Sequence, residues 1–499
     1  MNKPLVCMTL TGKTLEEDYK LVKKYEKQID LVELRADCLN EDEQLYIKRF
    51  PALIYLPCIL SIRRDIDGGR FNSGEFSRTN LFGRALAFAN PDRSRNYAYV
   101  EFEDDFQIPS IQDAAMAFGV KIIRSYHSIN ENLINIKEIC DSMRKTGYEI
   151  PKIAFRPSNL KDVATLFKES QSMFKYEHIV TAIGLQGQPS RILAHLTGSY
   201  LTYVSPVELE ENTAELGHTT PETLLNLYNF RELNENTKLF GIAGWPLQKA
   251  PAVQILNKGF KERNYNAISL PIRSPVIREN LYFAEQLDFN GLVIREPFHE
   301  SVIYYLKEKA HEVDLVGACN TIIRRNSKWA GFNTEITGFR TALTEFLGDT
   351  KIKRKKVALI GAGSSAKAVA YVLWQLGAKV CIFNRTLENA QILAEKYGFK
   401  YSPLDPSSVT LLDEYSTLII QTTTVGSDLQ DGDIKEVDPI SFYNFRGDEL
   451  LFDLIYSPAI TPLMRRASLA GCRTSNGKKM MEYSTHEQYK LFTGDYYNS

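Results

Sequence analysis

The chain has 499 residues, more than a single hydrophobic core usually organises, so we expect two to four domains. A hydrophobic content of 44%, a charged content of 24% and a net charge of -1 are typical of soluble globular proteins and give no broad positive field for nucleic acid. The seven cysteines form no CxxC pair, which favours reduced thiols over disulfide bonds or a structural zinc site. No stretch is apolar enough for a membrane span or a signal peptide, which favours a cytoplasmic protein.

Residues 1–206 alternate between short β-rich runs and longer amphipathic segments. This alternation predicts parallel strands joined by helices. Eight such units are the number that closes a (β/α)₈ barrel. The predicted strands are residues 5–10, 30–37, 53–63, 97–103, 120–128, 150–157, 178–187 and 200–206.

Polar residues stand near the ends of these strands, where a barrel of this type places its chemistry. The fifth predicted strand ends in His127, and the sixth carries Lys152 beside apolar residues. Charged side chains inside strand-like runs are unusual unless they line a polar pocket. Similar positions on strands two to four are taken by Glu33, Arg35, Arg63, Glu101 and Glu103.

Lys152 is a candidate nucleophile for a ketone. Its amine reacts only when uncharged, and nearby cations such as Arg35 and Arg63 would favour the neutral form. An iminium formed there acidifies the adjacent C–H bond, and His127 titrates in the range suited to removing that proton. Glu103 is then a candidate to orient His127, and the two arginines suit a substrate carboxylate. Alone, each residue would more often be a surface lysine or a loop histidine, but consecutive strand ends favour a shared site.

Six segments, VELRAD, SIRRDIDGGRF, YVEFE, IIRSYHS, PKIAF and GQPSR, occur in order within residues 1–232 and together resemble type I 3-dehydroquinate dehydratase. The resemblance implies a dehydratase barrel over 1–232 in which Lys152 forms an imine, His127 carries the proton and Glu103 orients His127. It further implies substrate contacts from Glu33, Arg35, Arg63 and Arg191.

Residues 207–237 are polar and acidic, which predicts the last barrel helix followed by a linker. Within them, TAELGHT departs from the Ser-Ala-Pro-Gly-Gln motif of the resembled family. Thr213 supplies a hydroxyl in place of the serine, and His218 replaces the glutamine. Both are therefore candidates for a substrate-binding lid.

A second α/β pattern begins at residue 239, and GAGSSA at residues 361–366 follows a strand-like run and opens a helix. Glycines of the form GxGxxA let the backbone approach a dinucleotide pyrophosphate at the helix start. The next predicted strand ends in Arg385, which suits the 2′-phosphate of NADP. A doubly wound domain without a cofactor is the alternative.

Residues 239–499 resemble shikimate dehydrogenase through VGACNTII, GFNTE, GAGSSAKA, FNRT, QTTTVG, FDLIYSPAITPL and SNGKKMM. The resemblance implies a two-lobed unit: a substrate-binding domain at 238–345, completed by a C-terminal helix at about 478–499, and a Rossmann NADP domain at 350–475. It implies that Asn320 and Asn333 bind substrate. The residues that it assigns to NADP are Gly361, Ala362, Gly363, Ser364, Asn384, Arg385 and Thr386.

The substrate site of this second half departs from the family pattern. The Ser-x-Ser-Pro turn reads QKAP at residues 248–251, His299 and Glu335 replace the catalytic lysine and aspartate, and Ser484 replaces a glutamine. One interpretation is loss of activity with the NADP fold retained. The other is retuning, in which His299 and Glu335 form an acid/base pair, Arg295 binds the substrate carboxylate, and the substrate is shikimate-like or quinate-like.

The leading hypothesis is therefore a bifunctional enzyme that converts 3-dehydroquinate to 3-dehydroshikimate and then to shikimate with NADPH. A second hypothesis makes residues 239–499 a nucleotide-binding regulatory module. A third makes the barrel an aldolase-type lyase, which the carboxylate-binding arginines disfavour. All three involve small molecules and no metal, nucleic acid or membrane, and the sequence predicts no particular oligomeric state.

Overall fold

The computed structural model describes residues 3–87, 90–128, 135–247, 250–348, 351–428 and 437–497. The chain divides into two compact units, and the break near residue 237 separates the barrel from the dehydrogenase-like half. The first unit also includes Ile272–Ser274 and Arg278–Asp288. Among the helices of the described ranges, none combines the length and apolar character that crossing a bilayer requires.

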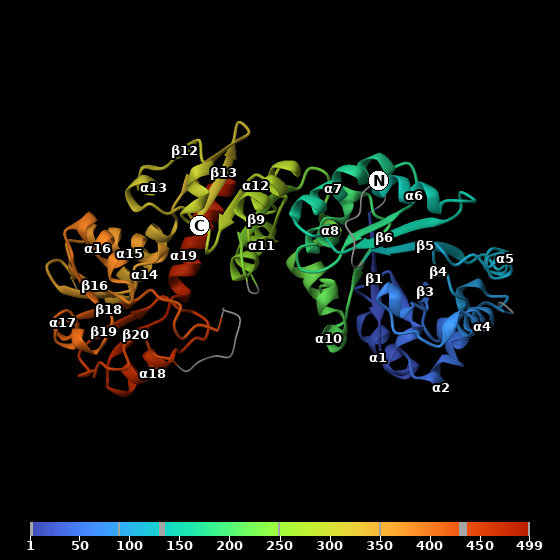
Figure 1. The fold of residues 1–499 in the computed structure, drawn as a ribbon, viewed down its shortest axis with the longest axis horizontal. Helices are drawn as coiled ribbons and strands as arrows, with labels where there is room; N and C mark the ends of the chain where they lie inside the picture. Colours follow the sequence, from blue (N-terminus) through green and yellow to red (C-terminus); the bar gives the residue numbers. More distant parts are fainter. Residues whose placement is uncertain are drawn as a thin grey trace. The chain divides into compact units, whose positions relative to one another are not determined.

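The first unit is an eight-stranded, all-parallel α/β barrel, as predicted (Figure 1). The order β7-β6-β5-β4-β3-β2-β1-β8 leaves β7 and β8 as neighbours that close the barrel without a ladder between them. One backbone hydrogen bond, from Tyr200 N to His178 O at 2.7 Å, lies just before these two strands. The strands are β1 Leu5–Leu10, β2 Leu31–Arg35, β3 Cys58–Ser61, β4 Tyr99–Glu103, β5 Lys121–Ser128, β6 Ile150–Phe155, β7 Ile179–Ala182 and β8 Leu201–Val204.

Amphipathic helices cover the barrel. A capping box at Thr14 begins α1, and another at Asn159 begins α7, so both helices start where the sequence supplies the cap. The strand predicted at 53–63 is wrong in its first half, because Leu53 ends a helical turn, Phe50–Leu53, and β3 begins only at Cys58. The helices are α1 Leu15–Tyr25, α2 Glu41–Gln44, α3 Phe50–Leu53, α4 Gly74–Leu86, α5 Pro109–Ala117, α6 Ile136–Met143, α7 Leu160–Ser170, α8 Gln188–Ile192, α9 Ala194–Thr197 and α10 Glu210–Thr213.

Residues 207–237 do not form the predicted helix and linker. They fold as short helical turns of the barrel unit, with Phe230 and Leu233 buried and Arg231 paired with Asp30 at 3.1 Å. With these side chains buried, the segment packs on the barrel and does not extend as a solvated linker.

The second unit contains two six-stranded sheets. The first has the order β10-β9-β11-β13-β14-β12 and mixed strand directions, and α19 packs on it through the stacked rings of Phe240 and Phe492. Its elements are β9 Lys238–Gly244, α11 Pro251–Glu262, β10 Ala267–Arg273, α12 Ile277–Gln286, β11 Gly291–Ile294, β12 Glu308–Lys309, α13 His311–Val316, β13 Thr321–Arg325, β14 Lys328–Phe332, α14 Glu335–Leu347 and α19 Lys478–Thr493. The end of β10 and most of α12 are the residues grouped with the first unit.

The other sheet is parallel and has the doubly wound order β17-β16-β15-β18-β19-β20. The strand order reverses between β15 and β18, the point at which such sheets bind ligands. Its elements are β15 Lys356–Ile360, α15 Ser364–Gln375, β16 Lys379–Asn384, α16 Leu387–Tyr397, β17 Lys400–Pro403, α17 Val409–Glu414, β18 Leu418–Gln421, β19 Leu450–Asp453, α18 Pro462–Leu469 and β20 Arg473–Ser475.

All seven cysteines are buried and carry free thiols. Cys7 belongs to an apolar layer inside the barrel, together with Leu31, Ile59 and Tyr203. The layer lies below the charged side chains described next.

Candidate active sites

Lys152 projects from β6 into a buried cluster of charged side chains. Its Nζ donates to Glu101 Oε2 at 2.7 Å and to Glu33 Oε1 at 3.2 Å, and it lies 4.4 Å from the centre of the Tyr203 ring. Only 3% of the lysine side chain is exposed. The charged groups in contact with the amine are therefore carboxylates, not the arginines that the sequence analysis expected.

Glu101 links Lys152 to the rest of this cluster. Its Oε1 accepts a hydrogen bond from Arg63 Nη2 at 3.3 Å and lies 3.5 Å from His127 Nε2. Burial opposes ionisation of Glu101, but Lys152 and Arg63 outweigh that effect and hold the pKa of the carboxyl well below its usual range. One carboxylate therefore contacts both the candidate nucleophile and the candidate proton carrier.

His127 lies on β5, and the strand register places it opposite Ala154 while Ser125 lies opposite Lys152. Burial lowers the pKa of its imidazole well below the usual value, and the positive charge of Arg63 lowers it further. Within the described residues, neither ring nitrogen forms a hydrogen bond. Both effects favour the neutral ring, the form that can accept a proton.

Glu103 does not hold His127 as predicted. Its Oε2 accepts from Nη1 of Arg78, a fully buried residue of α4, at 2.5 Å. Burial raises the pKa of Glu103 although the arginine opposes that effect. Glu101 takes the predicted place beside His127, because it lies two residues earlier on β4, at the level of the lysine amine.

Arg35 and Arg63, predicted to bind a substrate carboxylate, are already paired. Arg35 makes a two-pronged contact with Asp37, through Nε at 2.9 Å and Nη2 at 2.7 Å. Arg63 lies between Glu33 and Glu101, 3.6 and 3.3 Å from their carboxylates. These contacts balance the charges of the two arginines before any substrate enters.

Arg191 differs from Arg35 and Arg63 because no described carboxylate pairs with its guanidinium. Its Nη2 donates to Leu216 O at 2.9 Å, but Nε and Nη1 are buried and form no hydrogen bond with any described residue. Burial lowers the pKa of Arg191 to about 10, so the guanidinium is still charged at pH 7. A buried cation with two free nitrogens is the best anion site of the barrel.

The two lid candidates differ in what they offer. The Thr213 hydroxyl donates to the carbonyls of Leu209 and Glu210 in its own turn, at 3.3 and 3.5 Å, so its proton is already used. His218 is half-buried, stacks on Tyr203, and shares a 2.7 Å hydrogen bond between Nδ1 and Ser205 Oγ. His218 therefore lies beside the ring that covers Lys152, whereas Thr213 could only accept a hydrogen bond.

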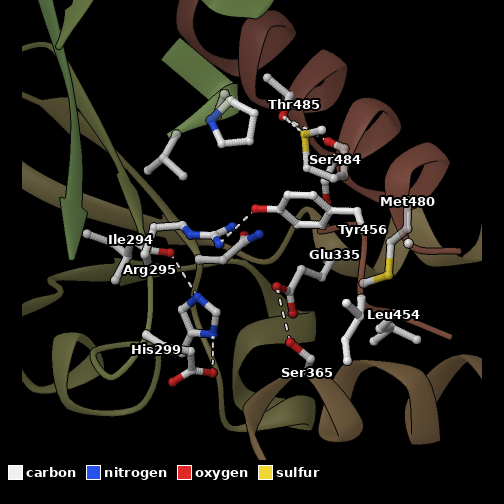
Figure 2. Close-up of a pocket in the computed structure, with 18 of the residues that line it drawn as sticks. Ile294, Arg295, His299, Glu335, Ser365, Leu454, Tyr456, Met480, Ser484 and Thr485 are labelled. Atoms are coloured by element: carbon white, nitrogen blue, oxygen red, sulfur yellow. Dashed lines mark hydrogen bonds and ion pairs between the residues drawn. The ribbon is translucent and has the colours of Figure 1, made fainter. Parts of the chain in front are cut away.

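The second unit has a cavity of about 200 Å³ between its two sheets (Figure 2). Residues from β11, α14, the β18 and β19 ends and α19 line it. Among them are the predicted residues Arg295, His299, Asn320 and Glu335, together with Ala250. The structure thus brings together four predicted residues that are up to 40 positions apart in the sequence.

His299 and Glu335, the predicted acid/base pair, both face this cavity, but each makes its hydrogen bonds with other described residues. His299 Nε2 lies 2.8 Å from Ile294 O and Nδ1 lies 3.3 Å from Glu296 Oε1 (Figure 2). Glu335 Oε1 instead accepts from Ser365 Oγ at 3.5 Å. The negative charge of Glu335 still acts on His299 from a distance.

Two asparagines were predicted to bind substrate, and only one of them lines the cavity. The Asn320 amide holds Thr334, with Nδ2 3.0 Å from Thr334 Oγ1 and Oδ1 2.8 Å from Thr334 N. Asn333 uses both ends of its amide on the backbone of Ala318 and Glu335, at 2.9 and 3.1 Å. Asn333 therefore shapes the turn before α14, and the structure gives it no place in the cavity wall.

Gln488 was not predicted, although it lies one helical turn beyond Ser484 on α19 and lines the cavity with it. Its Nε2 donates to Thr334 Oγ1 at 3.3 Å, while its Oε1 and the Ser484 hydroxyl are buried without a hydrogen bond to any described residue. Tyr456 was also missed; its hydroxyl accepts from Arg295 Nη2 at 3.3 Å. A four-residue spacing on a helix is the signal that could have indicated Gln488.

The glycine-rich loop has the geometry that a dinucleotide requires. Gly361 has φ 106°, and a Cβ there would lie 2.5 Å from Thr422 Oγ1, so only glycine fits. A Cβ at Gly363 would meet nothing within 4 Å, so the backbone before α15 is open to a ligand. Arg385 and Thr386 are exposed after β16, and Asn384 Nδ2 holds the turn through Thr386 O at 2.8 Å.

Comparison with known proteins covers both halves of the chain. Family models described as "Type I 3-dehydroquinase", "Shikimate dehydrogenase substrate binding domain" and "Shikimate / quinate 5-dehydrogenase" match residues 6–235, 242–322 and 342–456. The chain is 30% identical to the "Bifunctional 3-dehydroquinate dehydratase/shikimate dehydrogenase, chloroplastic" of Arabidopsis thaliana, over 99% of this chain and 82% of that protein. The chain belongs to this bifunctional dehydratase/dehydrogenase family.

Two further relatives match in different ways. The "Shikimate biosynthesis protein AroDE" of Chlamydia pneumoniae is 25% identical over 99% of this chain and 96% of its own length. The "Shikimate dehydrogenase (NADP(+))" of Carboxydothermus hydrogenoformans is 32% identical over 52% of this chain and 94% of its own length. The resemblance of each half, and of the fusion as a whole, is therefore confirmed.

In the dehydrogenase half, several residues differ from the family pattern, and their positions in the structure are informative. Ala250, Arg295, His299 and Glu335 all line the cavity. Gln248, the other departure in the first turn, lies outside the described residues. The substitutions are thus concentrated in one cavity wall.

Proposed function

We propose that the barrel dehydrates 3-dehydroquinate to 3-dehydroshikimate through a Schiff base on Lys152, and that the second unit reduces 3-dehydroshikimate to shikimate with NADPH. The observation that supports the first step best is the buried cluster in which Lys152 and His127 share Glu101. The cavity beside the glycine-rich loop supports the second step.

In the dehydration, the Lys152 amine attacks the ketone carbon, and loss of water leaves an iminium. Entry of the ketone must separate the amine from Glu33 and Glu101, which are then placed to take up its protons. Because the ring of His127 is neutral, it accepts the proton from the carbon next to the iminium. The same proton then leaves with the hydroxyl group as water, and hydrolysis of the iminium restores the amine.

The substrate carboxylate belongs beside Arg191, whose Nε and Nη1 are free to donate. Replacing Arg191 with leucine is expected to raise the KM for 3-dehydroquinate on the order of 10²-fold, because a buried charge pair is lost. The turnover number should change much less, since the lysine and histidine are untouched. Steady-state kinetics on the purified protein measure both.

Arg231→Leu is the control for this substitution, since Arg231 is 45% exposed and pairs with Asp30 away from the cluster. Its KM should equal that of the unmodified protein. An unchanged KM in Arg191→Leu would contradict the assignment of the carboxylate to Arg191.

In the reduction, a bound NADPH would supply a hydride to the carbonyl carbon. Glu335 relays a proton from solvent to the carbonyl oxygen as the hydride arrives, so its carboxyl holds that proton only during the transfer. Arg295 and Tyr456 form a hydrogen-bonded pair suited to the substrate carboxylate, and the free Gln488 Oε1 accepts from a substrate hydroxyl. Gln488 thereby takes the place that Ser484 is too short to fill.

NADP fits the residues at the start of α15. Gly361 and Gly363 bring the backbone close to the pyrophosphate, and Ser364 stands at the helix start. Arg385 is exposed and, within the described part of the chain, forms no ion pair, so its charge is available for the 2′-phosphate. Asn384 and Thr386 hold the turn that carries it.

A coupled assay tests the whole proposal. The full chain mixed with 3-dehydroquinate and NADPH should oxidise NADPH and form shikimate, and NADH should be a much poorer donor. Addition of 3-dehydroshikimate should bypass the first step. If NADPH binds but is not oxidised with any of these ketones, the second unit is a nucleotide-binding module and not a reductase.

A further inference from the structure

Both ring nitrogens of His299 face hydrogen-bond acceptors. Nε2 lies 2.8 Å from the backbone carbonyl of Ile294, and Nδ1 lies 3.3 Å from Glu296 Oε1 (Figure 2). A carbonyl oxygen has no proton to donate, so Nε2 must carry hydrogen. An ionised carboxylate also has none, so Nδ1 must carry hydrogen too.

A ring that donates from both nitrogens is an imidazolium. In either neutral tautomer, one lone pair would point at a carbonyl or a carboxylate oxygen, and two acceptors would repel each other. The ring cannot avoid this clash by turning into solvent, because only 5% of the His299 side chain is exposed.

The charged groups that act on His299 agree with this assignment. Burial opposes the cation, but the hydrogen bond that His299 donates to Glu296 and the charges of Glu335 and Glu296 outweigh burial and the nearby Arg295, so the pKa of His299 is raised. Although 55% of the Glu296 side chain is exposed, the contact with His299 and a hydrogen bond from Ser364 lower the pKa of that carboxyl. Opposite shifts of this kind are typical of an ion pair.

We propose that Glu296 is a positioning residue that keeps His299 as a permanent imidazolium in the cavity wall, so that His299 acts as a fixed positive charge and not as a proton donor. The proposal rests on the reductase function proposed above. Both N–H groups are held by protein acceptors, which leaves none for the substrate. The cation instead stabilises the negative charge that develops on the carbonyl oxygen as the hydride arrives.

Glu296→Gln removes the negative charge beside His299 while keeping the size and shape of the side chain. The glutamine amide fills the same space and satisfies a neutral ring, because its NH₂ can donate to an unprotonated Nδ1. Glu300→Gln is the matched control: it removes the same charge one residue beyond His299, but Glu300 pairs with Lys367 at 2.7 Å and does not contact the ring.

Histidine titration by NMR tests the charge state without any need for activity. The chain has seven histidines, so selective ¹³C labelling of the rings gives few signals, and loss of one signal in His299→Asn assigns it. We expect His299 to be protonated at pH 7 in the unmodified protein, and its titration to move to lower pH in Glu296→Gln but not in Glu300→Gln. A neutral His299 at pH 7, or equal titration in both variants, would overturn the proposal.

Kinetics test the consequence for the reaction. With NADPH and 3-dehydroshikimate, Glu296→Gln should lower kcat on the order of 10²-fold at alkaline pH with little change in KM, and the defect should shrink as the pH falls and the ring regains its proton. A loss that is the same at every pH would indicate a merely structural role and would contradict the proposal. If the unmodified protein oxidises no NADPH at all, the reductase function fails, and the NMR titration still decides the charge state of His299.

Discussion

Replacement of Lys152 by arginine is expected to reduce dehydratase activity by roughly 10⁴-fold or more, because a guanidinium cannot form an imine. Arginine keeps a positive charge between Glu33 and Glu101, so the barrel should remain folded. Lys152→Ala should lose as much activity and also destabilise the barrel by about 3–5 kcal/mol, since two buried carboxylates lose their shared partner. Dehydratase assays and thermal unfolding measure the two effects separately.

Borohydride reduction in the presence of 3-dehydroquinate provides the direct readout. The unmodified protein should gain one covalent adduct on the peptide that contains Lys152, and both variants should gain none. Lys121→Ala is the control, because Lys121 is exposed at the start of β5 and should not affect labelling. An adduct that persists in Lys152→Arg would place the Schiff base on another lysine.

Glu335→Gln is expected to lower the reductase activity by about 10²- to 10⁴-fold, because an amide cannot give up and take up a proton as a carboxyl group does. Dehydratase activity should stay unchanged, since the barrel is a separate compact unit. The hydrogen bond from Ser365 is retained by the glutamine oxygen, so the cavity should keep its shape. NADPH oxidation with 3-dehydroshikimate measures the loss.

The control for this substitution lies on the same helix. Glu345 stands near the end of α14, pairs with Lys479 at 3.7 Å, and is 52% exposed, so Glu345→Gln should retain full activity. Reductase activity within a few-fold of normal in Glu335→Gln would show that another group carries the proton.

The barrel and the approximate position of its site could be predicted because both follow from periodic patterns. Parallel strands bring their carboxyl ends to one edge, so Lys152 and His127 had to lie close together once the strands were recognised. The choice between Glu101 and Glu103 could not be made in this way. The two residues point to the same face, and the roughly 6.6 Å between them along the strand decides which one reaches His127.

Side-chain pairing within the protein was harder to predict than the position of the strands. Arg35 was predicted to bind substrate, but Asp37 lies two residues away and takes both prongs of its guanidinium. Asn333 is engaged in a similar way, because its side-chain amide forms hydrogen bonds with the backbone near the start of α14. The sequence shows that such a polar residue lies near a site, but it does not show which hydrogen-bond partners the residue has within the protein.

The burial of Cys7 has a consequence for the selectivity of the barrel's chemistry. The product of the proposed dehydration is a conjugated enone, which thiolates attack readily. Burial raises the pKa of the Cys7 thiol well above its usual value, and the charge of Glu33 adds to the effect, so almost no thiolate forms at pH 7. The apolar layer under the charged cluster thus protects the enzyme from alkylation by its own product, while the amine of Lys152 stays the reactive nucleophile.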